Sequence, residues 1–173
     1  MRVAVVGAGY WSEECHVPGL KEAKDTEVIA LVGRKKESAQ KQAQRLGISK
    51  VYQDYKEMLS NESLDAITIT TPNNSHKEIA IAAMEKGIHV FCEKPLALNA
   101  SEAQEMVNVA LQSEVVNHVG FTFRFLQSAI KAREVVSDGL IGEIFHARLW
   151  AENDSGLFVG PLLWRDKKKL SGS

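Results

Sequence analysis

The sequence predicts an α/β protein built on a doubly wound parallel sheet. Two features of the chain carry this prediction. Short, nearly continuous apolar runs alternate with helical patterns over residues 1–125, as expected for parallel strands that helices cover on both faces. The first run, at residues 3–6, leads directly into the turn Gly7-Ala8-Gly9 and then a helical pattern, which is the strand–turn–helix order of a dinucleotide-binding Rossmann unit.

The strands and helices of this sheet are placed by their apolar runs and end signals. We expect strands at residues 3–6, 28–32, 66–70, 88–92 and 117–121. We expect helices over residues 36–46, ended by Gly47; after the capping box Asp54–Glu57; from a cap at Asn74 or Ser75 to Gly87; and after the capping box Ser101–Gln104.

Beyond Phe125 the pattern changes. Residues 127–137 look helical, residues 144–152 alternate as in a half-buried strand of an open antiparallel sheet, and residues 152–173 read as loop. A lone helix and a lone strand make no core. We therefore expect a nucleotide-binding domain at residues 1–125 and, over residues 126–173, the start of an α+β domain that is incomplete. An unpaired strand also favours a homo-oligomer.

Composition excludes several classes of partner. The chain has 21 Lys and Arg against 22 Asp and Glu, so a nucleic acid or a membrane surface is not expected. No apolar run approaches the length that spans a bilayer. Cys15 and Cys92 match no metal-ligand spacing, so we expect no metal site and two reduced, buried thiols in a cytoplasmic protein.

The glycine-rich turn is the first candidate site, because ligands of a doubly wound sheet bind at the carboxyl ends of its strands. Gly7 permits the tight turn, and Gly9 lets a pyrophosphate approach the backbone. Ser12 holds the third position of the motif, where Gly or Ala is usual, and Tyr10 and Trp11 lie between. The alternative is an ordinary glycine-rich connection between strand and helix.

The residues after the second strand indicate the type of dinucleotide. NAD-binding proteins usually have Asp or Glu at this place, but here Gly33 is followed by Arg34, Lys35 and Lys36. Arg34 with Lys35 or Lys36 would attract a 2′-phosphate, so we favour NADP over NAD. The alternative is a solvated helix start, although a helix N-terminus disfavours cations unless they meet an anion.

Two further segments end strands at the same edge. The polar segment Thr71-Pro72-Asn73-Asn74-Ser75-His76 offers Asn73 and His76 as contacts to the nicotinamide ribose, or His76 simply occupies the first turn of a helix. Glu93-Lys94-Pro95 follows an apolar strand, and a cis Lys94–Pro95 bond would hold Lys94 in one direction. Its ammonium group could stabilise charge on a substrate oxygen; the alternative is a surface lysine before a turn.

These segments together resemble the glucose-fructose oxidoreductase/inositol dehydrogenase family, Gfo/Idh/MocA. The resemblance is carried by Gly7–Trp11, Thr71–His76, Phe91–Ala97, Gly120–Phe125, Gly142–Ile144 and the pair Trp164-Arg165. It implies an NAD(P)-dependent oxidoreductase that acts on a secondary alcohol or ketone of a sugar, a cyclitol or a related compound. Lys94 would be catalytic and polarise the reacting oxygen, while Glu93 would orient Lys94 and contact the nicotinamide side. Thr71, Pro72, Asn73 and His76 would line the cofactor.

The resemblance also implies that the second domain carries the substrate cradle and a histidine that acts as general acid/base, beyond residue 173. His16, His89, His118 and His146 match no such motif. We therefore expect this chain to bind cofactor with little or no turnover. The alternatives are a dinucleotide-binding module without catalysis and a fragment that associates with another chain.

Overall fold

The computed structural model describes residues 1–150, 152 and 166–172. The described residues form two compact units, residues 1–120 with 166–172, and residues 121–150 with 152. The division between the units thus follows Gly120, and the domains 1–125 and 126–173 stay a prediction.

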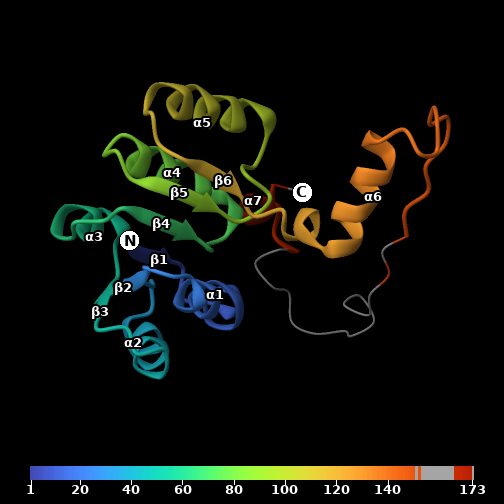
Figure 1. Ribbon diagram of the computed structural model, residues 1–173. Helices are drawn as coiled ribbons and strands as arrows, with labels where there is room; N and C mark the ends of the chain where they lie inside the picture. The colour runs from blue at the N-terminus through green and yellow to red at the C-terminus, as the bar shows by residue number, and fades with distance from the viewer. Residues whose placement is uncertain (151, 153–165, 173) are drawn as a thin grey trace. The chain divides into compact units, whose positions relative to one another are not determined.

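The first unit is built on a parallel sheet of six strands in the order β3-β2-β1-β4-β5-β6 (Figure 1). The strands are β1 (Arg2–Val6), β2 (Glu27–Val32), β3 (Lys50–Tyr52), β4 (Ala66–Ile69), β5 (His89–Cys92) and β6 (Asn117–Val119). The strand order reverses between β1 and β4, which are hydrogen-bonded neighbours. The doubly wound parallel sheet is therefore confirmed, and β1 and β4 flank its switch point.

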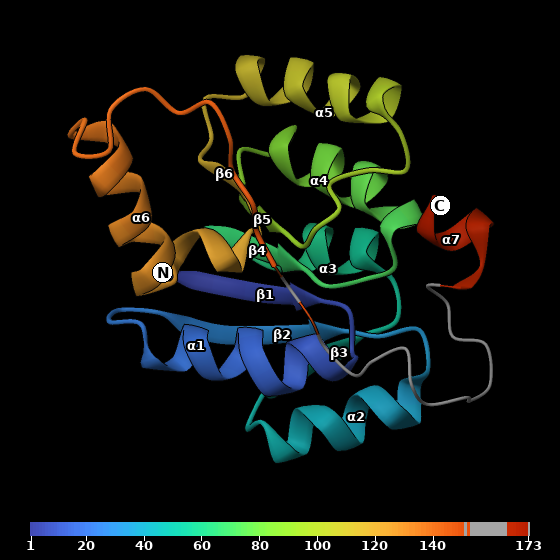
Figure 2. The same cartoon turned by 90° about the vertical axis from the view of Figure 1, so that its right-hand side faces the viewer.

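The helices of the first unit lie on both faces of the sheet (Figure 2). One face carries α1 (Val17–Glu22), which continues the π-helix η1 (Ser12–His16), and α2 (Lys36–Arg45). The other face carries α3 (Tyr55–Asn61), α4 (His76–Met84), which follows the 3-10 turn η2 (Asn73–Ser75), and α5 (Ala100–Gln112). A short helix, α7 (Lys168–Ser171), packs near η2.

Each face of the sheet has its own hydrophobic core, because successive residues of a strand point to opposite faces. Ala4 and Val6 of β1 belong to the larger core, together with buried residues of α3, α4 and α5. Val5 belongs to the smaller core with Leu31 and Ala43. All these side chains are almost fully buried, so the glycine turn that follows β1 starts from a rigid base.

The helix ends confirm some of the expected caps and correct others. Asp54 caps α3, since its side chain accepts a hydrogen bond from the backbone N–H of Lys56. The capping box expected at Ser101–Gln104 is wrong: the cap of α5 is Asn99, which accepts from the backbone N–H of Glu102 at 3.0 Å. Asparagine caps a helix as well as serine does, so Asn99, two positions earlier, begins the helix sooner.

Ser75 occupies the N-cap position of α4 without capping it. Its hydroxyl group lies 2.8 Å from the carbonyl oxygen of Pro72 and 2.8 Å from Oγ1 of Thr71, both of which precede the helix. The serine side chain thus stabilises the 3-10 turn η2 instead of the following helix.

The second unit contains η3 (Thr122–Phe125) and α6 (Gln127–Ser137), the latter as predicted. The strand expected at residues 144–152 is wrong for the residues that the structure describes there: none belongs to a strand, and Phe145 and Leu149 are 97% and 92% exposed. A strand needs a hydrogen-bonded neighbour, which an alternating pattern does not supply. The loop expected at residues 152–173 is also wrong at α7, and Trp164 and Arg165 lie outside the described residues.

The two cysteines differ in burial. Cys92 is buried in β5, where burial and then the charge of Glu93 raise the pKa of its thiol to about 12. Cys15 is exposed on the helix after the turn, so its expected burial is wrong; the sequence has no periodic signal that assigns a single small residue to one side of a π-helix. Both thiols are free. Among the described residues, no helix has the length and apolar character needed to cross a bilayer.

Candidate functional site

The turn after β1 is shaped so that only glycine fits at its first position. Gly7 has a φ of +125°, and a Cβ atom there would lie 2.4 Å from Oγ1 and 2.8 Å from the carbonyl carbon of Thr70. The N–H of Gly7 donates to the carbonyl oxygen of Val32 at 2.9 Å, and the Thr70 hydroxyl donates to the carbonyl oxygen of Gly7 at 3.0 Å. The ends of β2 and β4 therefore hold the turn from both sides.

Gly9, by contrast, faces open space. A Cβ atom at Gly9 would have no heavy atom within 4 Å, so packing does not explain a glycine at this position. The hydroxyl group of buried Ser12 accepts from the N–H of Gly9 at 3.0 Å and donates to its carbonyl oxygen at 2.7 Å. Ser12 thus holds the backbone of Gly9 in place at the start of a helix. The first N–H groups of a helix lack intrahelical partners.

Gln42 supports this loop, and the sequence analysis missed it. Its buried side-chain amide donates to Oγ of Ser12 at 2.9 Å and to the carbonyl oxygen of Gly9 at 3.2 Å. The available signal is the position of Gln42 on α2, one turn after Ala39 and next to Ala43, both of which are buried. A polar residue on a buried helix face requires a polar partner. Tyr10 and Trp11 form an exposed edge-to-face pair in the same loop, with ring centroids 5.5 Å apart.

The end of β2 has no room for a side chain at Gly33. A Cβ atom there would lie 2.6 Å from Cβ of Ala8 and 2.8 Å from Cβ of Ala39, so no carboxylate fits beside these neighbours. The next three residues, Arg34, Lys35 and Lys36, are exposed, and none forms an ion pair with a carboxylate of the described residues. Three cations at the start of α2 without a bound anion are unfavourable for the helix dipole.

Asn73 follows β4 and has an unused acceptor. The residue is 5% exposed, and its Nδ2 donates to the carbonyl oxygen of Ser171 at 2.8 Å. Its Oδ1 is buried without a hydrogen-bond partner among the residues that the structure describes. Because an orphaned buried acceptor costs about 1–3 kcal/mol, a ligand hydroxyl group at this place would be stabilising.

His76 connects two segments of the site. It is fully buried, and its ring nitrogens lie 2.9 Å from the carbonyl oxygens of Pro95 and Thr71. The ring therefore ties the segment after β4 to the segment after β5, where Lys94 precedes Pro95 through the expected cis bond. The side chain of Lys94 is exposed.

Glu93 is held on both carboxylate oxygens. Its Oε1 lies 3.0 Å from Nε2 of His16, and its Oε2 accepts from the backbone N–H of Lys94 at 3.2 Å. Burial favours the protonated acid, but the hydrogen bond and charge of His16, and then the backbone N–H and charge of Lys94, outweigh it. Together they hold the pKa of the Glu93 carboxyl group below its ordinary value. Gly120 leaves room for the carboxylate, since a Cβ atom there would lie 3.1 Å from Oε1.

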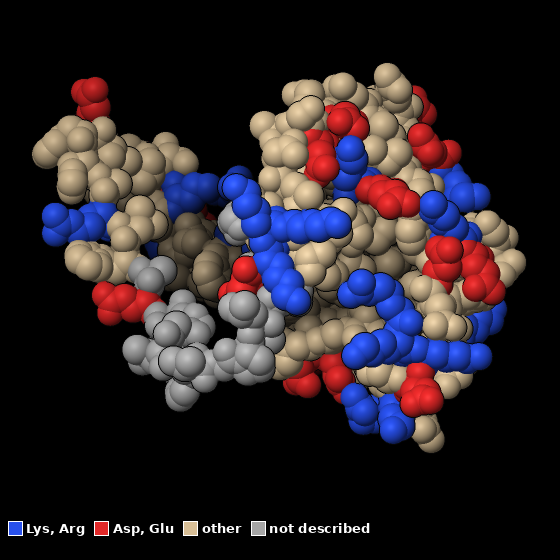
Figure 3. Space-filling view, turned by 180° about the vertical axis from the view of Figure 1, so that it is seen from behind, with Lys and Arg blue, Asp and Glu red and all other residues tan. Residues whose placement is uncertain are grey.

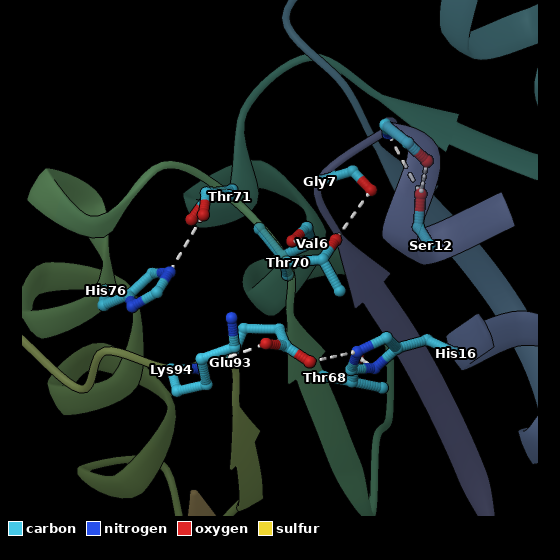
Figure 4. A network of polar contacts seen from close by, with 11 residues as sticks. Val6, Gly7, Ser12, His16, Thr68, Thr70, Thr71, His76, Glu93 and Lys94 are labelled. Carbon is cyan, nitrogen blue, oxygen red and sulfur yellow. Dashed lines mark hydrogen bonds and ion pairs between the residues drawn. The ribbon is translucent and has the colours of Figure 1, made fainter. Parts of the chain in front are cut away.

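His16 is a second site residue that the sequence did not predict. Its Nδ1 lies 2.8 Å from Oγ1 of Thr68 in β4 (Figure 4). Its ring packs edge-on against Phe91 of β5, with ring centroids 5.4 Å apart. The available signal is the spacing of Ser12 and His16, which places two polar residues four positions apart on the face of the helix that meets the sheet.

The parallel strands bring these segments to one edge of the sheet, where Figure 4 shows the turn after β1 beside the ends of β4 and β5. Among the described residues, no group of three or more His, Cys, Asp and Glu side chains is placed to hold a metal ion. Figure 3 shows Lys and Arg side chains interspersed with Asp and Glu on the face that it displays. Such mixing gives no single-sign field over that face.

Known proteins resemble this chain in sequence and in structure. The Gfo/Idh/MocA family model, described as an oxidoreductase family with an NAD-binding Rossmann fold, matches residues 1–121. The chain is 32% identical over 143 residues to a myo-inositol 2-dehydrogenase from Thermotoga maritima, covering 83% of this chain and 42% of that protein. It is 33% identical over 145 residues to a D-glucoside 3-dehydrogenase from Escherichia coli, covering 84% of this chain and 41% of that protein.

Solved structures give the same result. The crystal structure of an oxidoreductase domain protein from Kribbella flavida matches 99% of this chain with a TM-score of 0.86 and 31% identity, and this chain covers 48% of it. The chain therefore spans less than half the length of these relatives. Sequence and fold agree over the same segments, and the chain belongs to the Gfo/Idh/MocA oxidoreductase family, with an NAD-binding Rossmann fold over residues 1–121.

Proposed function

We propose that the protein is an NAD(P)-dependent oxidoreductase that moves hydride between nicotinamide and a secondary alcohol or ketone of a sugar, cyclitol or related compound. The observation that carries the proposal is Gly9, where a missing Cβ leaves open space at the start of a helix. The turn from Gly7 to Ser12 would hold the pyrophosphate there, and the unused Oδ1 of Asn73 would accept from a ribose hydroxyl group. Bound nicotinamide supplies the hydride acceptor or donor.

The residues after β5 would bind the substrate oxygen. The exposed ammonium group of Lys94 can donate a hydrogen bond to a carbinol or carbonyl oxygen and stabilise negative charge that develops on it. Glu93, which is fixed on both oxygens, provides a buried carboxylate beside that cation. Lys94 and Glu93 would thus provide the charges that hydride transfer requires beside the substrate oxygen.

NADP is the cofactor that the end of β2 favours. Gly33 has no space for the carboxylate that binds ribose hydroxyl groups in NAD-specific proteins, and Arg34 and Lys35 offer unpaired positive charge to a 2′-phosphate. NAD remains a weaker ligand in this proposal. The names of the relatives, an inositol and a glucoside dehydrogenase, support a polyol or sugar-like substrate.

The activity of the 173-residue chain is a separate part of the proposal. We propose that it binds cofactor with little or no turnover, because the chain spans less than half of the relatives' length. We further propose a homo-oligomer, which the exposed apolar residues of the second unit support, and a place in the cytoplasm, which the two free thiols support.

Titration of the purified chain with NADP⁺ and NAD⁺, followed by tryptophan fluorescence, tests the cofactor. We expect saturable binding that is tighter for NADP⁺; no binding of either would overturn the proposal. Assays with myo-inositol, methyl glucoside and levoglucosan test the substrate class. Any turnover found should fall by about 100-fold or more in Lys94→Met with little change in the NADP⁺ dissociation constant. Binding with little or no turnover is the result that the proposal expects for the 173-residue chain, and ordinary dehydrogenase turnover by this chain would contradict that part of it.

A further inference from the structure

His16 is a largely buried polar residue that the proposed reaction does not use. It lies on η1, directly after the glycine turn, and it contacts β4 through Thr68 and the end of β5 through Glu93. Its side chain is 9% exposed and that of Glu93 is 12% exposed, so the contact between them is shielded from water. One ring therefore links the nucleotide-binding turn to the residue next to Lys94.

The contacts determine which ring nitrogen carries a proton. An ionised carboxylate only accepts hydrogen bonds, so Nε2 of His16 must donate to Oε1 of Glu93. Nδ1 faces the hydroxyl group of Thr68, which can donate or accept. A neutral ring accepts from Thr68, and a protonated ring donates to it. Both contacts of the ring therefore persist in either charge state.

We propose that His16 is a positioning residue that holds the Glu93 carboxylate in one orientation beside Lys94, whichever charge state the ring has. The inference rests on the proposed oxidoreductase function and deepens it. Glu93 has two oxygens with different tasks: Oε1 is fixed by the ring, and Oε2 is thereby directed to the backbone N–H of Lys94. Gly120 lies beside the same carboxylate, where a Cβ atom would come within 3.1 Å of Oε1.

The charged surroundings of Glu93 come from three elements. His16 faces it from η1, Lys94 follows it in the chain, and Cys92 precedes it at the end of β5 as a thiol that stays protonated. Thr68 and Gly120, from β4 and the end of β6, add no charge. Without His16, two of the influences that lower the pKa of Glu93 would be lost, and burial, which raises it, would be opposed only by the backbone N–H and charge of Lys94.

The first test is carboxyl ¹³C NMR titration of Glu93 in the full chain, with the signal assigned from Glu93→Gln. His16→Leu should raise the pH at which Glu93 is half protonated, so that the acid dissociation constant of Glu93 falls about tenfold. His16→Gln, which retains an N–H donor, should recover part of the change. Thr68→Val, which keeps the shape of β4, should give a smaller rise than His16→Leu. His89→Gln serves as control, because His89 lies at the start of β5, at the opposite end from Glu93, and its Nδ1 accepts from the backbone N–H of Val116.

The second test is the ratio of NADP⁺ dissociation constants for His16→Leu and wild type, measured near pH 5 and near pH 8. The ratio should increase several-fold at the lower pH, where Glu93 of the variant takes up a proton, whereas His89→Gln should show no such change. An unchanged Glu93 titration in His16→Leu, or a ratio independent of pH, would overturn the inference. Absence of cofactor binding by wild type would instead overturn the proposed function, and the NMR titration would still decide whether His16 controls Glu93.

Discussion

Replacement of Gly7 and Gly9 by alanine separates the two reasons for a glycine in the turn. At Gly7 the backbone has a φ of +125°, which costs an alanine about 1–3 kcal/mol. Its Cβ atom would also lie 2.4 Å from Oγ1 and 2.8 Å from the carbonyl carbon of Thr70, and overpacking of this kind costs about 1–3 kcal/mol. Gly7→Ala should therefore reduce the free energy of unfolding by about 2–6 kcal/mol.

Gly9→Ala should have the opposite profile. Its Cβ atom would meet nothing within 4 Å and its φ is not in the left-handed region, so stability should stay within about 1 kcal/mol of wild type. The added methyl group would instead occupy the space proposed for the pyrophosphate, and NADP⁺ affinity should fall at least about tenfold. Gly19→Ala is the matched control, since Gly19 in α1 also faces open space but lies away from the turn.

Thermal melts and NADP⁺ titrations of the three variants decide the matter. At roughly 2–4 °C per kcal/mol for a chain of this size, Gly7→Ala should melt at least about 4 °C lower than wild type. A wild-type melting temperature for Gly7→Ala would contradict the described turn. Wild-type NADP⁺ affinity for Gly9→Ala would contradict the binding of a dinucleotide at Gly9, and equal affinity losses for Gly9→Ala and Gly19→Ala would show that the effect is not local.

Three further outcomes follow from other parts of the chain. Arg34→Ala should weaken NADP⁺ about 10- to 100-fold more than NAD⁺ in binding titrations, because only NADP⁺ offers a 2′-phosphate; equal losses would contradict that contact. Gln42→Leu should cost about 1–3 kcal/mol in urea unfolding, since it removes two hydrogen bonds from a buried loop, and wild-type stability would refute the role of Gln42. Hydrogen bonds from Lys50 and Tyr52 lower the pKa of Glu62, whose side chain is 4% exposed. The ionised Glu62 therefore stabilises the folded state above pH 4.5, and this contribution is lost as the pH falls below that value. Glu62→Gln should flatten this acid limb of stability and should bring the pKa of Tyr52 down from about 12 in a spectrophotometric titration; an unchanged limb and an unchanged tyrosine would contradict the cluster.

The sequence predicts the inner strands of the sheet well, for a physical reason. Parallel strands buried on both faces need continuous apolar runs, and residues 28–32 and 66–70 have them. The edge strand β3 has only three residues, of which one is exposed and two are half-buried. It therefore has no continuous apolar run, and the sequence predicts no strand there. The strand expected at residues 144–152 shows the converse error, because alternation describes a face and does not provide a partner.

The site is predictable where it is local and hidden where it is not. Gly7, Gly9 and Ser12 are recognisable because motif and turn lie within a few residues. His16 and Glu93 are 77 residues apart in the sequence, and only the pairing of β4 with β5 brings Thr68 and Glu93 to the same ring. Side-chain networks that join separate strands depend on tertiary packing, which periodicity does not encode.

A crystal structure of the chain with NADP⁺ tests the central claim most directly, namely that the turn between β1 and η1 holds a dinucleotide. We expect density for the pyrophosphate against Gly9, the 2′-phosphate at Arg34 and a ribose hydroxyl group at Oδ1 of Asn73. Saturated crystals with no density at the turn, or with the dinucleotide bound elsewhere, would contradict the claim.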